Sequence, residues 1–260
     1  MEGALLKTLE NIINYKTAPL VQWEPVIGEE LSPGKKREDI LTHNAIISEL
    51  WNMNAQQVTG IIADEGRLEL DIAAQNSKVQ RVTHLTLLGT FAIAARNNWV
   101  RAQNEGRPNA DKVRIATDIE SIRENSQDAV VMNMILGCLA MPEAHDNIVN
   151  MLKFAHSLLR KDCPEPGSLI IVRPNPEGGS FETYECLTPE SELKAGADYH
   201  FIVKGLEEFG AMKNLYTPDS FLKIAMNKAG FDMGATRLIA GDDVSSWKES
   251  PFLLNVCELR

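Results

Sequence analysis

The strongest constraint on the fold is an alternation of short apolar runs with longer helical stretches, which begins near residue 58. Short apolar runs of this kind predict buried strands. Their alternation with helices predicts a mostly parallel sheet covered by helices on both faces. We expect strands at residues 58–63, 79–82, 113–117, 129–136 and 168–173, and helices at residues 67–75, 87–103, 148–159 and 218–229. The chain is therefore predicted to be an α/β protein.

The first 55 residues show a different pattern, which predicts an N-terminal helical arm or lid. Residues 4–14 have the apolar spacing of an amphipathic helix, and residues 17–34 contain three prolines, which favour an extended segment. A second helix is expected at residues 36–54, with a buried face of Ile40, Ile46, Ile47, Leu50 and Trp51. We therefore divide the chain into an arm, residues 1–55, and a domain, residues 56–260.

Composition and charge argue against several classes of function. The formal net charge is −10 and the densest basic run is 35-KKR-37, so we expect no nucleic-acid partner. No apolar run approaches the roughly 20 residues of a membrane-spanning helix, so we expect no membrane insertion. The four cysteines include no C-x-x-C pair, which favours reduced thiols, a cytoplasmic location and no bound metal.

Several polar or glycine residues fall where the predicted strands end. Ligands of parallel α/β sheets bind outside the carboxyl ends of the strands. Gly66, Thr83, Asp118 and Asn133 lie at or just beyond those ends in this prediction. They are the first candidates for a ligand site.

Four segments after residue 114 carry a resemblance to a known family. They read 115-IATDIESI-122, 128-DAVVMNMILGCL-139, 151-MLKFAHSLLRKDCPEPGSLIIVRPNP-176 and 215-LYTPDSFLKIAMNKAGF-231. In this order and spacing the chain resembles the class I S-adenosylmethionine (SAM)-dependent methyltransferases over residues 56–260. The resemblance implies a Rossmann-like methyltransferase fold, with a mostly parallel seven-stranded sheet and an antiparallel C-terminal hairpin. It also implies SAM as the cofactor and a small molecule as the methyl acceptor.

The segment 58-VTGIIADEGR-67 resembles the glycine-rich cofactor loop of that family, with most of its glycines replaced. On the family's pattern Gly60 stands at an acidic position, and Ile62 and Asp64 stand at glycine positions. Gly66 keeps the glycine that lets the backbone turn. Asp64 either repels the carboxylate of SAM or serves as a favourable helix-start residue. The loop is therefore expected to turn at Gly66 and to contact SAM differently from the family.

The resemblance places the remaining cofactor contacts after three later strands. Thr83 or His84 stands where the family has an acid that binds both ribose hydroxyls. Asp118 stands at the position that meets the adenine amino group, with Ile119 beside it, and Asn133 lines the reaction mouth. Two alternatives stay open, because Asp118 is equally suited to capping the next turn and Asn133 to satisfying buried backbone groups.

The candidate catalytic and substrate residues come from the arm and from the late segments. His200 is the best general-base candidate, since the unperturbed pKa of a histidine lies near neutrality. Tyr216 is a weaker catalytic candidate. The alternative is that residues 199–203 form a strand with His200 on its solvent face. Three aromatic residues are candidate walls of a substrate pocket or packing anchors: Tyr15, Trp23 and Tyr199.

Three hypotheses of function follow from these patterns. The first is a SAM-dependent methyltransferase that acts on a small molecule or a soluble partner. The second is a SAM-independent pseudo-methyltransferase that serves as a partner or scaffold subunit in a homo- or hetero-oligomer. The third is an enzyme that uses the old substrate pocket for a cyclisation or an isomerisation, since a fold does not fix a function.

Overall fold

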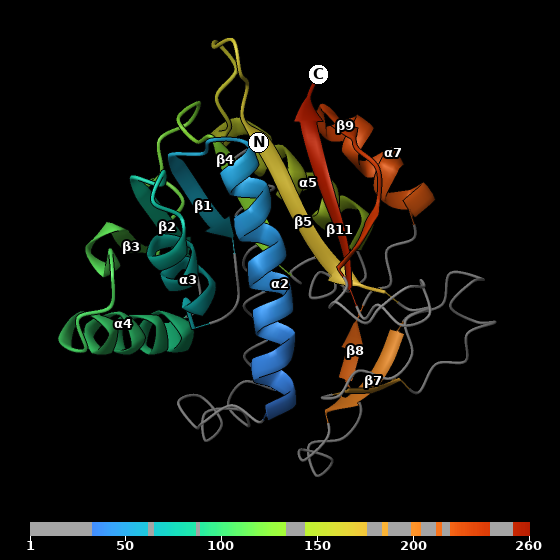
Figure 1. The fold of residues 1–260 in the computed structure, drawn as a ribbon. Helices are drawn as coiled ribbons and strands as arrows, with labels where there is room; N and C mark the ends of the chain where they lie inside the picture. The colour runs from blue at the N-terminus through green and yellow to red at the C-terminus, as the bar shows by residue number, and fades with distance from the viewer. Residues whose placement is uncertain are drawn as a thin grey trace.

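The computed structural model describes residues 33–61, 65–86, 89–133, 144–175, 184–186, 199–203, 212–214, 219–239 and 252–260. The helix expected at residues 4–14 and the candidates Tyr15, Trp23, Asp64 and Tyr216 lie outside these ranges. For Tyr199 and His200 the backbone alone is described. The described part contains a large sheet flanked by helices and a smaller second sheet (Figure 1).

The large sheet has a parallel half and an antiparallel end (Figure 1). Its strands are β1 Gln57–Ile61, β2 Arg81–Leu85, β3 Val113–Ala116, β4 Ala129–Asn133, β5 Ser168–Pro174, β9 Phe231–Met233, β10 Arg237–Ile239 and β11 Phe252–Leu259. β1 pairs in parallel with β2 and β4, β2 pairs with β3, and β4 pairs with β5. β11 pairs antiparallel with β5. This arrangement confirms the predicted Rossmann-like α/β architecture.

Eight strands occupy seven positions in this sheet. β9 pairs with residues 257–259 of β11, and β10 pairs with residues 252–254 of the same strand, both antiparallel. They are two halves of one edge strand, and Gly234 lies between them. The Gly234 N–H donates to the Val256 carbonyl at 3.1 Å, and a Cβ at this glycine would lie 2.4 Å from that oxygen. The predicted sheet with an antiparallel C-terminal hairpin is therefore confirmed, with one interrupted edge strand.

Helices cover both faces of the sheet, as predicted. They are α2 Pro33–Asn52, α3 Arg67–Gln75, α4 Gly89–Asn104, α5 Ala144–Leu158, α7 Asp219–Ala229 and the short 3-10 helix η1 Ala110–Lys112. Alternate residues of each strand enter two separate apolar clusters. Val130 and Met132 of β4 pack with α5 and α7, whereas Ala129 and Val131 pack with α2 and α3. Burial of these two clusters is the main stabilisation of the fold.

Helix α2 buries a face that differs at both ends from the predicted one. Ile46, Ile47 and Leu50 are buried, as expected. Ile40 and Trp51 are 57% and 42% exposed, so the prediction was wrong for these two residues. Residues three and four apart share a helix face, and the face that is buried here consists of Thr42, His43, Ile46, Ile47 and Leu50.

A polar bridge joins α2, α3 and the segment after α4. His43 Nδ1 lies 2.5 Å from Asp71 Oδ2, and Arg107 donates to the other carboxylate oxygen of Asp71. Burial raises the pKa of Asp71, but hydrogen bonds and charge from His43 and Arg107 outweigh burial, so the pKa lies below its ordinary value of 3.8. The ionised form of Asp71 is therefore the one that stabilises the fold.

Asp71→Asn is expected to lower the free energy of unfolding near pH 7 by about 1–3 kcal/mol, because it removes charge-assisted hydrogen bonds. The folded-state pKa of Asp71 lies below the unfolded-state pKa. Its stabilisation is therefore present above the unfolded-state value and is lost as pH falls through the folded-state value. Urea unfolding near pH 7 and near pH 3 should give a smaller difference between wild type and variant at the lower pH. An equal difference at both pH values would contradict this, and Asp111→Asn, an exposed acid in η1, is the control.

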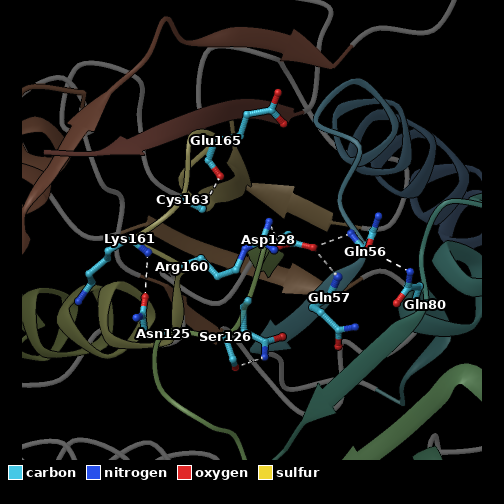
Figure 2. A network of polar contacts seen from close by, with 11 residues as sticks. Gln56, Gln57, Gln80, Asn125, Ser126, Asp128, Arg160, Lys161, Cys163 and Glu165 are labelled. Atoms are coloured by element: carbon cyan, nitrogen blue, oxygen red, sulfur yellow. Dashed lines mark hydrogen bonds and ion pairs between the residues drawn. The ribbon is translucent and has the colours of Figure 1, made fainter.

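A polar network secures the amino ends of β1 and β4, opposite the edge at which ligands are expected (Figure 2). Asp128 Oδ2 accepts the backbone N–H groups of Gln56 and Gln57 at 2.7 and 2.8 Å. Asp128 Oδ1 pairs with Arg160, which balances the charge of a carboxylate that is 8% exposed. One side chain thus holds two neighbouring strands together at their starts.

A second sheet lies beyond the carboxyl ends of the parallel strands (Figure 1). It consists of β6 Tyr184–Cys186, β7 Tyr199–Val203 and β8 Met212–Asn214, paired antiparallel in that order. These strands come between β5 and α7 in the chain, and β7 confirms the strand expected at residues 199–203. The other two strands were not predicted, because three residues are too few to show a periodic pattern.

Candidate functional site

The carboxyl ends of four parallel strands meet at one edge of the large sheet. These strands end at Ile61, Leu85, Ala116 and Asn133. β1 lies between β2 and β4, so the strand order reverses direction between β1 and β4. Ligands of open α/β sheets bind at such a point, outside the carboxyl ends of the strands. This edge is therefore the candidate functional site.

The turn that leads from β1 into α3 centres on Gly66. Gly66 is the N-cap residue of α3 and has φ 71° and ψ 21°, in the left-handed region that glycine adopts without strain. A Cβ at this position would lie 3.3 Å from the Cβ of Ala95 in α4. A glycine has no side chain to cap the first N–H groups of α3, so the start of this helix depends on the backbone at Gly66 and on its neighbours. The turn expected at Gly66 is confirmed, while Ile62 and Asp64 lie outside the described residues.

Strand β2 ends later in the chain than predicted, so a different residue follows it at the ligand edge. The strand runs to Leu85 rather than to Val82, so Thr83 lies in mid-strand, paired with Thr59 and Arg114. The expectation that Thr83 stands at the strand end is wrong. Thr86 is the first residue beyond the strand.

Thr86 is a site candidate that sequence reasoning missed. Its backbone N–H donates to the Ala116 carbonyl at 3.0 Å, which holds it beside the end of β3. The residue is 1% exposed, and its Oγ1 has no hydrogen-bond partner among the described residues. A buried hydroxyl without a partner is costly, so an unpaired one at a ligand edge is suited to meeting a ligand. The run 82-VTHLT-86 shows no regular alternation of apolar and polar residues, so the sequence alone did not mark where the strand ends.

Asp118 caps the turn that follows β3. Its Oδ1 accepts the Ser121 N–H at 2.6 Å, and the Ser121 hydroxyl donates to the Asp118 carbonyl at 2.9 Å. Asp118 is exposed, and Ile119 packs half-buried against an apolar cluster. The capping alternative is therefore present in the structure. Capping uses one carboxylate oxygen, so it is compatible with a ligand contact through the other.

Asn133 is the last residue of β4 and pairs in register with Val172 of β5. The residue is half-buried, but its Oδ1 is buried and has no hydrogen-bond partner among the described residues. The alternative that this oxygen satisfies a buried backbone group is not observed in the part of the chain that the structure describes. Asn133 thus offers a second unpaired acceptor at the same edge as Thr86.

A buried ion pair lies directly behind the Gly66 turn. His84 Nδ1 is 3.1 Å from Glu69 Oε2, and both side chains are fully buried. His84 comes from β2 and Glu69 from the first turn of α3. The contact therefore joins the side chain of a central strand to the first turn of the neighbouring helix. The sequence offered His84 as a ribose ligand and gave no sign of Glu69.

Two of the remaining candidates, Tyr199 and His200, lie in the small sheet. His200 and Tyr199 belong to β7 of the small sheet, where they pair with Lys213 and Asn214 of β8. Across the described ranges, no group of three or more His, Cys, Asp or Glu residues is placed to hold a metal ion. Within the same ranges, no helix has the length and apolar character needed to cross a membrane.

No protein-family model and no curated protein matches the sequence. Solved structures do match it. The CcbJ methyltransferase from Streptomyces caelestis has a TM-score of 0.56 at 16% identity, over 84% of this chain and 88% of its own. Magnesium protoporphyrin IX methyltransferase from Synechocystis PCC 6803, with bound SAM, has a TM-score of 0.54 at 12% identity, over 96% of each chain. A SAM-dependent methyltransferase from Clostridium acetobutylicum ATCC 824 has a TM-score of 0.52 at 12% identity, over 84% and 90%.

Structural similarity at such low sequence identity shows a shared fold and does not show a shared activity. The matches cover 84% to 96% of this chain. The chain therefore has the fold of the class I SAM-dependent methyltransferases.

Proposed function

We propose that this chain is a SAM-dependent methyltransferase with a small molecule or a soluble partner as its methyl acceptor. The observation that carries the proposal is the left-handed turn at Gly66, placed between β1 and α3 at the ligand edge of a methyltransferase fold. Such a turn brings backbone N–H groups and the start of a helix toward a bound ligand. Two buried, unpaired acceptors at the same edge support the proposal: Thr86 Oγ1 and Asn133 Oδ1.

The residues at this edge fit an adenosine-containing ligand in part. In the proposal Asp118 and Ile119 meet the adenine, Thr86 makes one hydrogen bond to the ribose, and Asn133 lines the reaction mouth. Asp64 is proposed as a residue of the cofactor loop that precedes Gly66. The role first considered for Thr83 passes to Thr86, because Thr83 lies in mid-strand. SAM supplies an electrophilic methyl group when bound.

The protein's contribution to the reaction is mainly orientation. Holding the acceptor atom in line with the methyl group replaces a chance encounter with a fixed geometry. His200 is the proposed base that removes a proton from the acceptor, with Tyr216 in support. Tyr15, Trp23 and Tyr199 are proposed for the substrate pocket, and residues 1–55 for a lid over the domain. The small sheet that carries His200 lies beyond the carboxyl ends of the parallel strands, which supports a substrate role for it.

A second candidate is a SAM-independent protein with this fold, either a partner or scaffold subunit or an enzyme of cyclisation or isomerisation. The observation that favours it is the missing acid at two positions. Gly60 lies in β1 where the family has an acid, and the neutral Thr86 follows β2. One structure with the same fold, at a TM-score of 0.54, is a complex that contains the Haloferax volcanii Trm112 methyltransferase activator. A comparable protein partner is part of this second candidate.

Calorimetric titration with SAM and with S-adenosylhomocysteine (SAH) separates the two candidates. We expect saturable binding of both ligands, about ten- to hundredfold weaker than that of a site with a ribose-binding carboxylate. Absence of saturable heat with both ligands up to about millimolar concentration would exclude SAM binding and leave the second candidate.

Gly66→Ala is expected to weaken SAH binding about tenfold or more, because alanine resists the left-handed backbone and its Cβ approaches Ala95. Gly106→Ala is a matched control. Gly106 also has a positive φ of 69°, but no atom lies within 4 Å of a Cβ placed there. Both variants carry similar backbone strain, of about 1–2 kcal/mol. An equal loss of SAH affinity in the two variants would contradict the assignment of Gly66 to the binding site.

A further inference from the structure

We infer that the buried Glu69–His84 pair, a carboxylate against an imidazole, is a positioning device, which holds the Gly66 turn in shape where the usual loop glycines are missing. Its consequence for ligand affinity rests on the proposed function. The effect of the pair on the backbone at Gly66 is independent of the proposed function, because the turn is part of the fold. Glu69 and His84 are therefore positioning residues and not catalytic ones.

The pair stands where it can control the turn. His84 Cγ lies 3.7 Å from the position that a Cβ on Gly66 would take, so the ring packs against the turn from behind. Glu69 is the third residue of α3, in the turn of helix that Gly66 begins. The Leu70 N–H donates to the Gly66 carbonyl at 3.3 Å, which closes this first turn. The pair thus fastens the start of α3 to β2.

The same ring also lies beside the other end of the loop. His84 pairs in register with Gly60 of β1, where the family has an acidic residue. Because neighbouring strands in register present side chains to the same face, the imidazole stands next to the place that the missing acid would occupy. His84 therefore stands beside both Gly60, near the end of β1, and Gly66, at the start of α3.

The burial of both side chains restricts the positions that Glu69 and His84 can take. A buried carboxylate is stable only with an opposite charge nearby. Among the described residues, the His84 imidazole is the side chain that meets the Glu69 carboxylate, and Glu69 Oε1 has no hydrogen-bond partner there. An acid in the first turn of a helix commonly reaches back to cap the helix or faces water. Glu69 points inward instead, which fixes the helix start relative to the strand.

Helix α3 supplies a matched control. Asp71, two residues after Glu69, forms the second histidine–carboxylate pair of this helix, with His43 of α2. That pair also joins α3 to another element, and its histidine is 4% exposed. Asp71 is the fifth residue of α3, beyond the turn that Gly66 begins. Substitution of Asp71 therefore disturbs the same helix by the same chemistry, away from the turn.

Amide hydrogen exchange in the ligand-free protein tests the inference directly. The variants are the double substitution Glu69→Met/His84→Leu, which keeps the site filled with apolar side chains, and Glu69→Gln, with Asp71→Asn as control. The two reporters are the Leu70 amide, which closes the first turn, and the Asn76 amide, which donates to the Ile72 carbonyl at the far end of α3. We expect exchange at Leu70 to become about tenfold faster or more in both Glu69 variants, with Asn76 unchanged. Asp71→Asn should leave Leu70 exchange unchanged.

Unchanged exchange at Leu70 in a folded Glu69→Met/His84→Leu protein would overturn the inference. Equal acceleration at Leu70 and Asn76 would also overturn it, because the pair would then stabilise the whole helix rather than the turn. SAH titration of the same variants should show about tenfold weaker binding than wild type, with Asp71→Asn near wild type. If wild type binds no SAH, the proposed function fails, and exchange at Leu70 still decides the role of the pair.

Discussion

Thr86→Asp is expected to tighten SAH binding by about ten- to hundredfold. The proposal places Thr86 at the ribose, where one hydroxyl makes one hydrogen bond. A carboxylate would accept hydrogen bonds from both ribose hydroxyls, and a hydrogen bond to a charged group contributes about 1.5–3 kcal/mol. Each 1.4 kcal/mol or so corresponds to a factor of about ten in the dissociation constant. Calorimetric titration of wild type and variant with SAH measures the change.

The same substitution should destabilise the protein without ligand. Thr86 is 1% exposed, so an aspartate there would hold a nearly buried charge with no partner among the described residues. We expect the free energy of unfolding to fall by about 1–3 kcal/mol, and bound SAH to restore much of that loss. Thr86→Asn, which has the shape of aspartate without its charge, is the control. Equal SAH affinity in the two variants would contradict the assignment of this position to the ribose.

Asp128→Ala is expected to lower the free energy of unfolding by about 2–4 kcal/mol, because two backbone N–H groups lose their hydrogen bonds to a charged acceptor. The substitution leaves the N–H groups of Gln56 and Gln57 without their acceptor and Arg160 without its counter-charge (Figure 2). Both losses fall at the starts of β1 and β4, at the centre of the sheet. Urea unfolding near neutral pH measures the effect.

Two further variants test whether the Asp128 carboxylate itself causes this loss of stability. Asp128→Asn keeps one acceptor oxygen and should lose less stability than Asp128→Ala. Gln80→Ala removes an exposed side-chain hydrogen bond to Gln56, of 3.0 Å, in the same network, and should change stability by less than about 0.5 kcal/mol. A loss below about 1 kcal/mol for Asp128→Ala would mean that water replaces the carboxylate at the strand ends.

The parts of the fold that sequence predicted well are those in which local pattern and tertiary packing agree. Helix α3 has the bounds expected for it, because Gly66 marks its start and the apolar spacing persists to Gln75. β5 contains the apolar run 169–172 and was predicted to within one residue of its observed bounds. The methyltransferase-like order of the late segments predicted the sheet, including its antiparallel end.

The parts that sequence missed depend on contacts between distant elements. The Glu69–His84 pair joins residues of α3 and β2, which are brought together by the packing of the helix on the sheet. The end of β2 was misplaced because Thr83 and Thr86 are both polar, and the backbone pairing with β3 decides which of them terminates the strand. Ile40 and Trp51 of α2 carry apolar side chains that the fold leaves at the surface, which composition cannot reveal.

A crystal structure of the protein grown with SAH tests the central claim most directly. We predict that the adenosine lies across the carboxyl ends of β1, β2 and β3, against Gly66, with its ribose within hydrogen-bonding distance of Thr86 and its adenine beside Asp118 and Ile119. SAH bound elsewhere, or an edge that stays empty at saturating SAH, would contradict a cofactor site there. The SAM-independent account of this fold would then take its place.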